Sequence, residues 1–228
     1  MAEFHFVEDY ERVIANLIAT YPLDEAMSLA VGGYYEIVGS IERDLLRHCG
    51  LANGMSIFDL GCGSGRLASA LSQSFDINYT GTDVVQSLLD YAAGKSRPTY
   101  KFILHKDLSL PAPDESQNFF TAFSVFTHLL HSESFIYLEE AKRVLKPGGK
   151  VVFSFVEFAE PGHWQILKDT VAATKQRTPT HLNTFIERNA IARWAEHLGF
   201  SEPEFIDAAA APWGGSPLGQ STAILVKL

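Results

Sequence analysis

Apolar residues in the first fifty positions recur with the period of an α-helix. Residues 8–20 place a set of apolar side chains on one helical stripe, namely Tyr10, Val13, Ile14, Leu17 and Ile18. A second stripe predicts a helix that ends near Gly50, and its apolar members are Ile37, Ile41, Leu45 and Leu46. These two patterns predict helices that pack ahead of a main sheet.

From Ser56 onward the pattern changes to short apolar runs that alternate with amphipathic segments. The runs predict strands at 56–60, 77–82, 100–104, 119–125, 150–156, 204–210 and 221–227. The amphipathic segments predict helices at about 65–73, 84–93, 133–145 and 182–198. Strands that alternate with helices indicate a mostly parallel sheet whose two faces are both covered.

The last two predicted strands are joined differently, because little more than a Gly/Pro loop separates them. A short connection suits antiparallel neighbours, whereas parallel strands need a crossover. The predicted fold class is therefore α/β, a Rossmann-like doubly wound sheet of seven strands, mostly parallel with an antiparallel last strand, plus N-terminal helices. No linker or repeat divides the 228 residues. We expect one domain over 1–228, made of N-terminal helices (1–50), a core (51–156), and a lid with the C-terminal strands (157–228).

Charge and composition narrow the choice of partners and location. The formal net charge is -9, and no Lys/Arg cluster forms a phosphate-binding stripe, which disfavours nucleic acid and an anionic membrane as partners. The start of the chain shows no secretory signal, and no apolar run approaches the ~20 residues of a membrane helix. Cys49 and Cys62 are too few for a disulfide framework. We therefore expect a cytoplasmic protein with reduced thiols.

The strongest chemical signal is the segment Phe58-Asp-Leu-Gly-Cys-Gly-Ser-Gly-Arg-Leu67, where an apolar strand meets three alternating glycines and a helix. Glycines at such a turn let the backbone approach a ligand closely. A dinucleotide fingerprint, G-x-G-x-x-G, would need its third glycine at Arg66. A phosphate-binding P-loop would need Lys-Ser/Thr after the loop, which is also missing. A ligand gripped through its pyrophosphate is therefore disfavoured.

This segment resembles motif I of the class I S-adenosylmethionine-dependent methyltransferases, usually written D-x-G-x-G-x-G. The resemblance implies S-adenosyl-L-methionine as cofactor and assigns the loop to it, through Asp59, Gly61, Cys62, Gly63, Gly65 and Arg66. Asp83, at the end of the second predicted strand, suits hydrogen bonds to ribose hydroxyls, with Val84 beside it. Simpler interpretations stay open. Asp59 or Asp83 can cap a helix, and Arg66 can be an exposed first-turn arginine.

Further segments resemble the same family in the expected order. Asp107 and Leu108, after the third strand, resemble the residues beside the adenine, although Asp107 can also be a turn residue. The segment 123–129 resembles the fourth strand and its turn, which adds Ser124 to the expected cofactor contacts. The segment 140–149 resembles the helix and turn that lead into the fifth strand.

The reaction implied by the resemblance is an SN2 transfer of a sulfonium methyl group to an O, N, S or C atom. Positioning is the protein's main task, and a general base is needed only if the acceptor must lose a proton. His128, just past the fourth strand, is the first candidate base, and His163 is the second. His131 is close to His128 but can cap the next helix. Glu157 and Trp164 follow the fifth strand, and the irregular stretch 158–181 is either a substrate lid or an ordinary surface helix and loop.

The acceptor is expected to be a small molecule. The N-P-P-[FYW] motif of amino-methylating nucleic-acid and protein enzymes is missing, since Ser-Val-Phe-Thr occupies positions 124–127. No metal-ligand spacing is present, and the sequence leaves monomer and homodimer open. Two alternatives remain, a non-enzymatic methyltransferase-like module that acts through a partner and, less favoured, a nicotinamide-dependent oxidoreductase.

Overall fold

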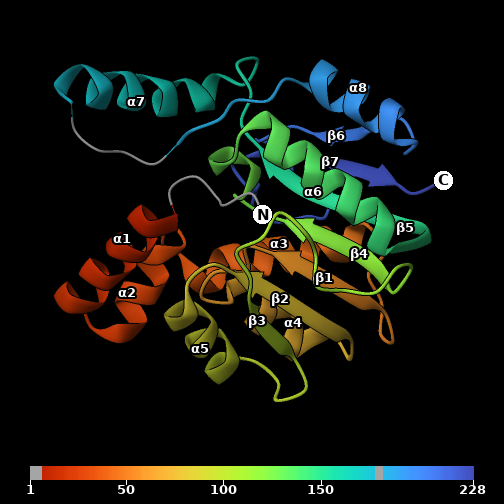
Figure 1. Ribbon diagram of the computed structural model, residues 1–228, viewed down its shortest axis with the longest axis horizontal. Helices are drawn as coiled ribbons and strands as arrows, with labels where there is room; N and C mark the ends of the chain where they lie inside the picture. Colours follow the sequence, from red (N-terminus) through yellow and green to blue (C-terminus); the bar gives the residue numbers. More distant parts are fainter. Residues whose placement is uncertain (1–6, 178–181) are drawn as a thin grey trace.

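A seven-stranded sheet forms the centre of the computed structural model, which describes residues 7–177 and 182–228 (Figure 1). The strand order is β3-β2-β1-β4-β5-β7-β6. The strands are β1 (Ser56–Leu60), β2 (Asn78–Asp83), β3 (Lys101–Leu104), β4 (Gln117–Ala122), β5 (Leu145–Phe155), β6 (Glu204–Ile206) and β7 (Ser221–Val226). β1 to β5 pair in parallel, and β7 runs antiparallel to both β5 and β6. The predicted fold class is confirmed, including the antiparallel last strand.

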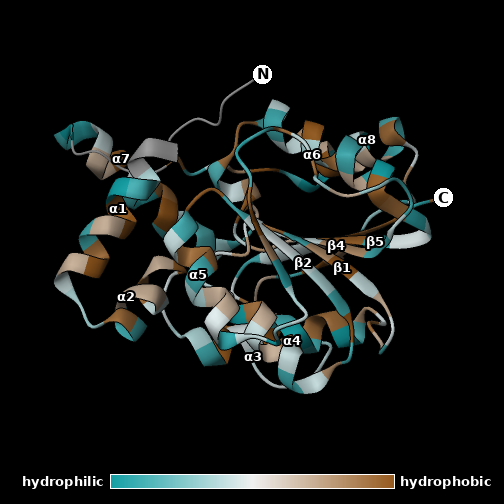
Figure 2. Cartoon of the chain, turned by 60° about the horizontal axis from the view of Figure 1, so that its bottom comes forward, coloured by the Kyte–Doolittle hydropathy of each residue, from teal (hydrophilic) through white to brown (hydrophobic). Residues whose placement is uncertain are grey.

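Helices cover both faces of this sheet (Figure 2). The α-helices are α1 (Val7–Thr20), α2 (Leu23–Ala30), α3 (Tyr35–His48), α4 (Arg66–Ser74), α5 (Gln86–Lys95), α6 (His131–Val144), α7 (Trp164–Gln176) and α8 (Arg188–Leu198). Two short 3₁₀ turns are η1 (Phe126–His128) and η2 (Pro161–His163). One buried cluster joins the sheet to α6 and α8, and a second joins its other face to α3 and α4. None of the helices within the described ranges is long and apolar enough to cross a membrane.

The N-terminal helices pack beside the main sheet as predicted, but their apolar stripes are narrower. Ile14 is buried, whereas Val13 and Ile18 of the same predicted stripe are exposed. Ile37 of α3 is also exposed, whereas Glu42 on that helix is buried. The eight residues of α2 were not predicted, because two buried side chains, Ala26 and Met27, are too few to show a helical period.

Several predicted boundaries are wrong where tertiary contacts override the local pattern. The fourth strand ends at Ala122 and not at 125, since Ser124 adopts a left-handed backbone with φ 57°. The sixth strand stops at Ile206 and not at 210. The predicted helix 182–198 begins only at Arg188.

The stretch 158–181 contains a surface helix, α7, which has no buried residue. The secondary structure of this stretch is therefore that of an ordinary surface helix and loop. Residues 178–181 lie outside the described residues. Residues 182–187, which we call the strap, are extended and make a parallel bridge between Phe185 and Val156. Figure 1 shows α7 projecting from the β5 end of the molecule toward the side where α1 lies.

Candidate functional site

The glycine loop leaves the carboxyl end of β1 with a backbone that other residues rarely adopt. Gly61, Gly63 and Gly65 all have positive φ, at 64°, 55° and 84°. A Cβ at Gly65 would stand 2.5 Å from the Cβ of Ala92 on α5, and one at Gly61 would stand 2.5 Å from Val125. The alternating glycines therefore let one loop turn tightly between the elements that follow β1, β2 and β4.

Asp59 lies inside the sheet and does not cap a helix. Its carboxylate accepts from Tyr79 Oη on β2 at 2.5 Å and from Thr121 Oγ1 on β4 at 2.8 Å. Burial raises the pKa of Asp59 to about 7, against the opposing effect of these two hydrogen bonds. The side chain links the central strand to both neighbours directly beneath the glycine loop. Tyr79 and Thr121 carry no motif that would have revealed this role.

Asp83 ends β2 as predicted and faces the glycine loop. Its Oδ2 accepts from the Gly63 backbone N–H at 3.0 Å, and its Oδ1 accepts from the Val85 N–H at 3.0 Å. The second bond lies just ahead of α5, so Asp83 also organises the start of that helix. Burial raises the pKa of Asp83 to about 6, while the backbone donors lower it. Val84 is half-buried beside it.

Two residues of the motif turn away from the loop's open side. The thiol of Cys62 is buried against β2, where a Cβ at Gly81 would stand 2.8 Å from its Sγ. Arg66 donates to the buried Glu42 at 2.9 Å and to the Val31 carbonyl at 2.5 Å. Only 12% of the Arg66 side chain is exposed, so the interpretation as an exposed first-turn arginine is wrong. In this structure Arg66 fastens α4 to α3 and to the turn after α2.

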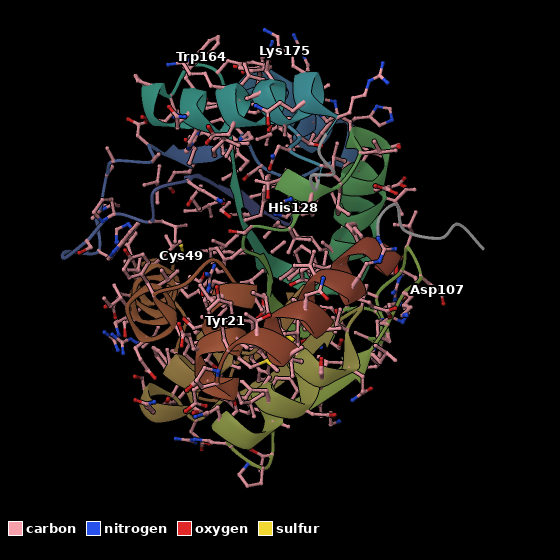
Figure 3. All side chains as sticks on the ribbon, turned by 90° about the vertical axis from the view of Figure 1, so that its left-hand side faces the viewer. Tyr21, Cys49, Asp107, His128, Trp164 and Lys175 are labelled. Carbon is pink, nitrogen blue, oxygen red and sulfur yellow. The ribbon has the colours of Figure 1, made fainter. Side chains whose placement is uncertain are left out.

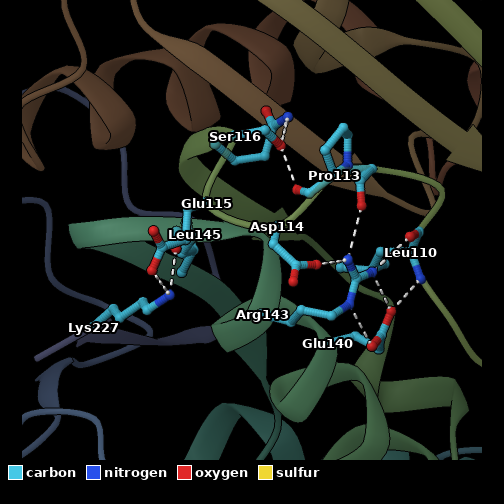
Figure 4. A network of polar contacts seen from close by, with 11 residues as sticks. Leu110, Pro113, Asp114, Glu115, Ser116, Glu140, Arg143, Leu145 and Lys227 are labelled. Atoms are coloured by element: carbon cyan, nitrogen blue, oxygen red, sulfur yellow. Dashed lines mark hydrogen bonds and ion pairs between the residues drawn. The ribbon is translucent and has the colours of Figure 1, made fainter.

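Asp107 and Leu108 lie in the connection between β3 and β4, which a polar network holds against α6 (Figure 4). Arg143 donates to the Leu110 and Ala112 carbonyls, both at 2.9 Å, and the Leu110 N–H donates to Glu140 Oε2 at 2.9 Å. Both Asp107 and Leu108 are half-buried. The predicted segment 140–149 thus supplies the side chains that hold the connection just after the predicted adenine-side residues.

Ser124 has the strained backbone already noted, and it stands at the carboxyl end of β4. Its N–H donates to Ser154 Oγ at 2.7 Å, and the Ser154 hydroxyl donates to Gln220 Oε1 at 2.6 Å. The Ser124 hydroxyl reaches the same Gln220 oxygen at 3.3 Å. A non-glycine residue held in this region commonly marks a functional site. Gln220 was missed, because nothing in the Gly/Pro loop before β7 signals its contact with β4 and β5.

His128 and His131 both hold the strap. His128 Nδ1 donates to the Leu182 carbonyl at 2.7 Å, and His131 Nε2 donates to the Phe185 carbonyl at 3.1 Å. His131 therefore does not cap α6, whose first turn is closed by Glu133 accepting from the Leu130 N–H at 2.7 Å. Figure 3 places the exposed His128 between α7 and the α1–α2 pair. Both histidines thus link the turn and helix after β4 to the strap.

His163 is buried, and both of its ring nitrogens hydrogen-bond to backbone groups. Nδ1 accepts from the Glu157 N–H at 3.0 Å, so the ring proton lies on Nε2, which donates to the Gly219 carbonyl at 3.3 Å. Only 2% of His163 is exposed. The ring links two loops and presents no nitrogen to an acceptor, which disfavours His163 as the second candidate base.

Glu157 is the buried centre of the β5–β7 end of the sheet. Arg188 donates to both of its oxygens at 2.8 and 3.0 Å, and Ser221 Oγ donates to Oε1 at 2.6 Å. Arg188 also reaches Asp207 at 2.6 Å, and these residues line an open pocket at this end. Trp164 packs on Phe158, with ring centroids 5.8 Å apart, and Phe158 stacks on Phe185 at 4.4 Å. These groups join α7, α8 and the strap to β5.

Comparison with known proteins agrees with the sheet and the loop. Residues 58–153 match the family described as a methyltransferase domain. A fatty-acid O-methyltransferase of Mycolicibacterium smegmatis is 29% identical over 103 residues, which cover 44% of this chain and 37% of that protein. An uncharacterised protein of Methanocaldococcus jannaschii is 32% identical over 123 residues, 54% of each chain. The matched stretches thus span between a third and about half of these curated relatives.

Solved structures resemble the chain over nearly its whole length. A methyltransferase of Thermotoga maritima, described as a possible histamine N-methyltransferase, superposes with a TM-score of 0.66 at 17% identity and covers 98% of this chain and 99% of that one. Magnesium protoporphyrin IX methyltransferase of Synechocystis, solved with S-adenosylhomocysteine, gives a TM-score of 0.62 at 15% identity, with 98% and 96% covered. Residues 58–153 thus match a methyltransferase family, and the whole chain has the fold of S-adenosylmethionine-dependent methyltransferases, which agrees with the resemblance drawn from its motifs.

Proposed function

We propose that this chain is an enzyme that transfers the methyl group of S-adenosylmethionine by SN2 displacement to an O, N or C atom of a small molecule. The observation that carries this proposal is the hydrogen bond from the Gly63 N–H, in the glycine loop, to the buried carboxylate of Asp83. A buried carboxylate beside three positive-φ glycines matches a ligand that offers hydroxyl donors and needs close backbone approach. The cofactor supplies the activated methyl group, and the chain supplies its alignment with the acceptor.

The residues present fit this cofactor along the carboxyl edge of the sheet. Asp83 and Val84 would meet its ribose, and the half-buried Asp107 and Leu108 would flank its adenine. The backbone of Gly61 to Gly65 would meet its amino-acid part, and Ser124 would stand near the reacting methyl group. Asp59, Cys62 and Arg66 would act indirectly, since each side chain is engaged within the protein. This division differs from the motif assignment, which gave Asp59, Cys62 and Arg66 directly to the cofactor.

Titration of the purified protein with S-adenosylmethionine, S-adenosylhomocysteine and NADH tests the cofactor. We expect binding of both sulfur compounds and none of NADH. Asp83→Ala should weaken binding by about 2–4 kcal/mol, because charged hydrogen bonds to ribose are lost. Asp90→Ala, on the exposed side of α5, is the matched control and should leave affinity unchanged. Unchanged affinity in Asp83→Ala would remove the ribose assignment.

We propose His128 as the general base when the acceptor must lose a proton. Its Nδ1 proton is held by the Leu182 carbonyl, so the lone pair of the neutral ring lies on Nε2. His128→Gln keeps a donor for that carbonyl and lacks the base. We expect kcat to fall by about 10²–10⁴-fold with S-adenosylhomocysteine affinity unchanged. A loss in affinity or stability alone would identify His128 as a strap contact only.

The acceptor class is a small molecule in this proposal. The net charge of -9 and the missing N-P-P-[FYW] motif both disfavour nucleic acid. Incubation with S-adenosylmethionine labelled in its methyl group, followed by fractionation of a metabolite extract, tests the class. Label in low-molecular-weight fractions supports it, whereas label only in protein or nucleic acid would overturn it.

A further inference from the structure

The α1–α2 pair lies directly over the glycine loop. A Cβ at Gly63 would stand 2.6 Å from Val31 Cγ1, in the turn after α2. The loop also donates to this segment through Ser64 Oγ, which reaches the Met27 carbonyl at 2.8 Å, and through Arg66, which reaches the Val31 carbonyl. The space in front of Gly63, where a ligand needs close approach, is thus covered by residues of the chain itself.

The underside of α1–α2 is apolar and faces the same end of the sheet as Asp83. Ile14 and Met27 are buried against Val85 and Leu88 at the start of α5. Burial raises the pKa of the Tyr10 phenol well above its ordinary value, and the Asp83 carboxylate contributes to that rise. Tyr10 packs against this same cluster, which Val84, the neighbour of Asp83, also contacts.

Two glycines separate this pair from α3. Gly32 and Gly33 have φ of 85° and 81°, and a Cβ at either would meet no atom within 4 Å. α3 begins two residues later and is fastened to α4 by the buried ion pair between Glu42 and Arg66, at 2.6 Å. Two glycines in open space allow the large backbone rotations that a hinge requires.

The outer contacts of the pair are exposed and individually weak. Asp24 pairs with Lys95 at 3.1 Å and accepts from Tyr91 at 2.8 Å, both on α5. Glu11 pairs with Lys106 at 2.6 Å, in the connection after β3. Exposed ion pairs of this kind contribute little stability, so they can hold a closed position without locking it.

We propose that α1–α2 (Val7–Ala30) is a hinged lid on the cofactor site, which turns about Gly32 and Gly33 and must lift for S-adenosylmethionine to enter and for S-adenosylhomocysteine to leave. The Asp24–Lys95 and Glu11–Lys106 pairs are its latches. In the closed position Tyr10, Met27 and Val31 exclude water from the loop and from Asp83. This inference rests on the proposed function and adds the route by which the cofactor exchanges.

A reversible cross-link across one latch tests the lid. The double variant Asp24→Cys with Lys95→Cys is joined by a short bis-methanethiosulfonate reagent and released by dithiothreitol. Both native cysteines are buried, and the wild type treated with the same reagent checks that they do not react. The matched control is Asp76→Cys with Arg97→Cys, which replaces an exposed ion pair at 3.2 Å between two elements outside the lid.

Association of labelled S-adenosylhomocysteine is followed by rapid filtration. We expect the joined lid variant to bind about tenfold or more slowly than the control, with recovery after reduction. Loading before cross-linking should slow release by a similar factor. Unchanged rates in the joined variant would overturn the lid, while the wild type would still bind and the proposed function would stand. No binding by the wild type would overturn the proposed function itself.

A second measurement needs no cofactor. Asp24→Asn weakens one latch, and Asp76→Asn is its control at an ion pair outside the lid. Hydrogen–deuterium exchange of α1–α2 and of the glycine loop should rise together, by about two- to fivefold, in Asp24→Asn only. Faster exchange in α1–α2 without any change in the glycine loop would show that the pair does not cover the loop, and would overturn the proposal.

Discussion

The two ends of the sheet's carboxyl edge reach their geometry by different means. At the β1–β2 end, the glycines come directly after β1 and Asp83 is the last residue of β2. The Asp83 carboxylate accepts a hydrogen bond from the Gly63 backbone N–H. At the β5–β7 end, Glu157 is held by Arg188 and Ser221, which lie 31 and 64 positions away in the chain. The first end therefore has a local sequence signature, and the second depends on side chains that the fold alone brings together.

This difference matches the division of tasks in a methyltransferase domain. The cofactor is the same in every member, so its loop can be read from spacing and residue type. The acceptor differs between members. We propose that it lies here on the side of α7, the strap and α8, which are joined by Glu157, His163 and the Phe158 stack. Function thus resides in a common site and in a variable one on the same fold.

Removing the Arg188–Glu157 ion pair at the β5–β7 end should have the largest effect on stability. Arg188→Ala leaves Glu157, which is 1% exposed, without its cation, and we expect a loss of about 3 kcal/mol in the free energy of unfolding. Urea denaturation measures it, and Arg193→Ala on the same helix is the control, since its pair with Glu196 is exposed. S-adenosylhomocysteine affinity should stay within about twofold if the two ends are independent. A large loss of affinity would show that they are coupled.

His163 distinguishes a structural from a catalytic histidine at that same end. His163→Ala leaves the Glu157 N–H and the Gly219 carbonyl without their partner, and we expect a loss of about 2 kcal/mol in unfolding free energy. The pH profile of methyl transfer should keep its shape, since the ring presents no nitrogen to an acceptor. If His163→Ala lost one limb of the pH profile and kept its free energy of unfolding, His163 would be identified as the base.

The cofactor end should respond to pH through Asp83. In the proposed site, ionised Asp83 would accept hydrogen bonds from ribose, and burial raises the pKa of this carboxyl to about 6. Affinity for S-adenosylhomocysteine should therefore be constant above that pKa and fall as the pH drops through it. The limiting slope is about tenfold, or 1.4 kcal/mol, per pH unit. Asp83→Asn should bind weakly, with a flat profile from about one pH unit below that pKa to about two units above it. Calorimetry at each pH measures both proteins, and a sloping profile in the variant would assign the titration to another group.

The sequence pattern correctly predicted the fold class, the antiparallel last strand and the ends of β1 and β2. It failed where one residue's conformation ended an element, as at Ser124, and where a segment with helical composition was held extended, as in the strap. Hydrophobic period reports how one segment is buried against its neighbours. It carries no information about a backbone hydrogen bond such as that from Thr184 N–H to the Thr127 carbonyl, at 2.8 Å, which keeps the strap out of α8.

By itself, the sequence determined the fold class, the glycine loop and Asp83, because spacing along one strand–loop–helix unit fixes which atoms meet there. Only the tertiary structure decided that Arg66 turns to Glu42, that His163 is buried between two loops, and that Val31, in the turn after α2, lies over Gly63. Each of these depends on which distant segment lies against the residue. A side chain's charge and hydrogen-bonding groups state what it can bind, and its three-dimensional neighbours decide what it does bind.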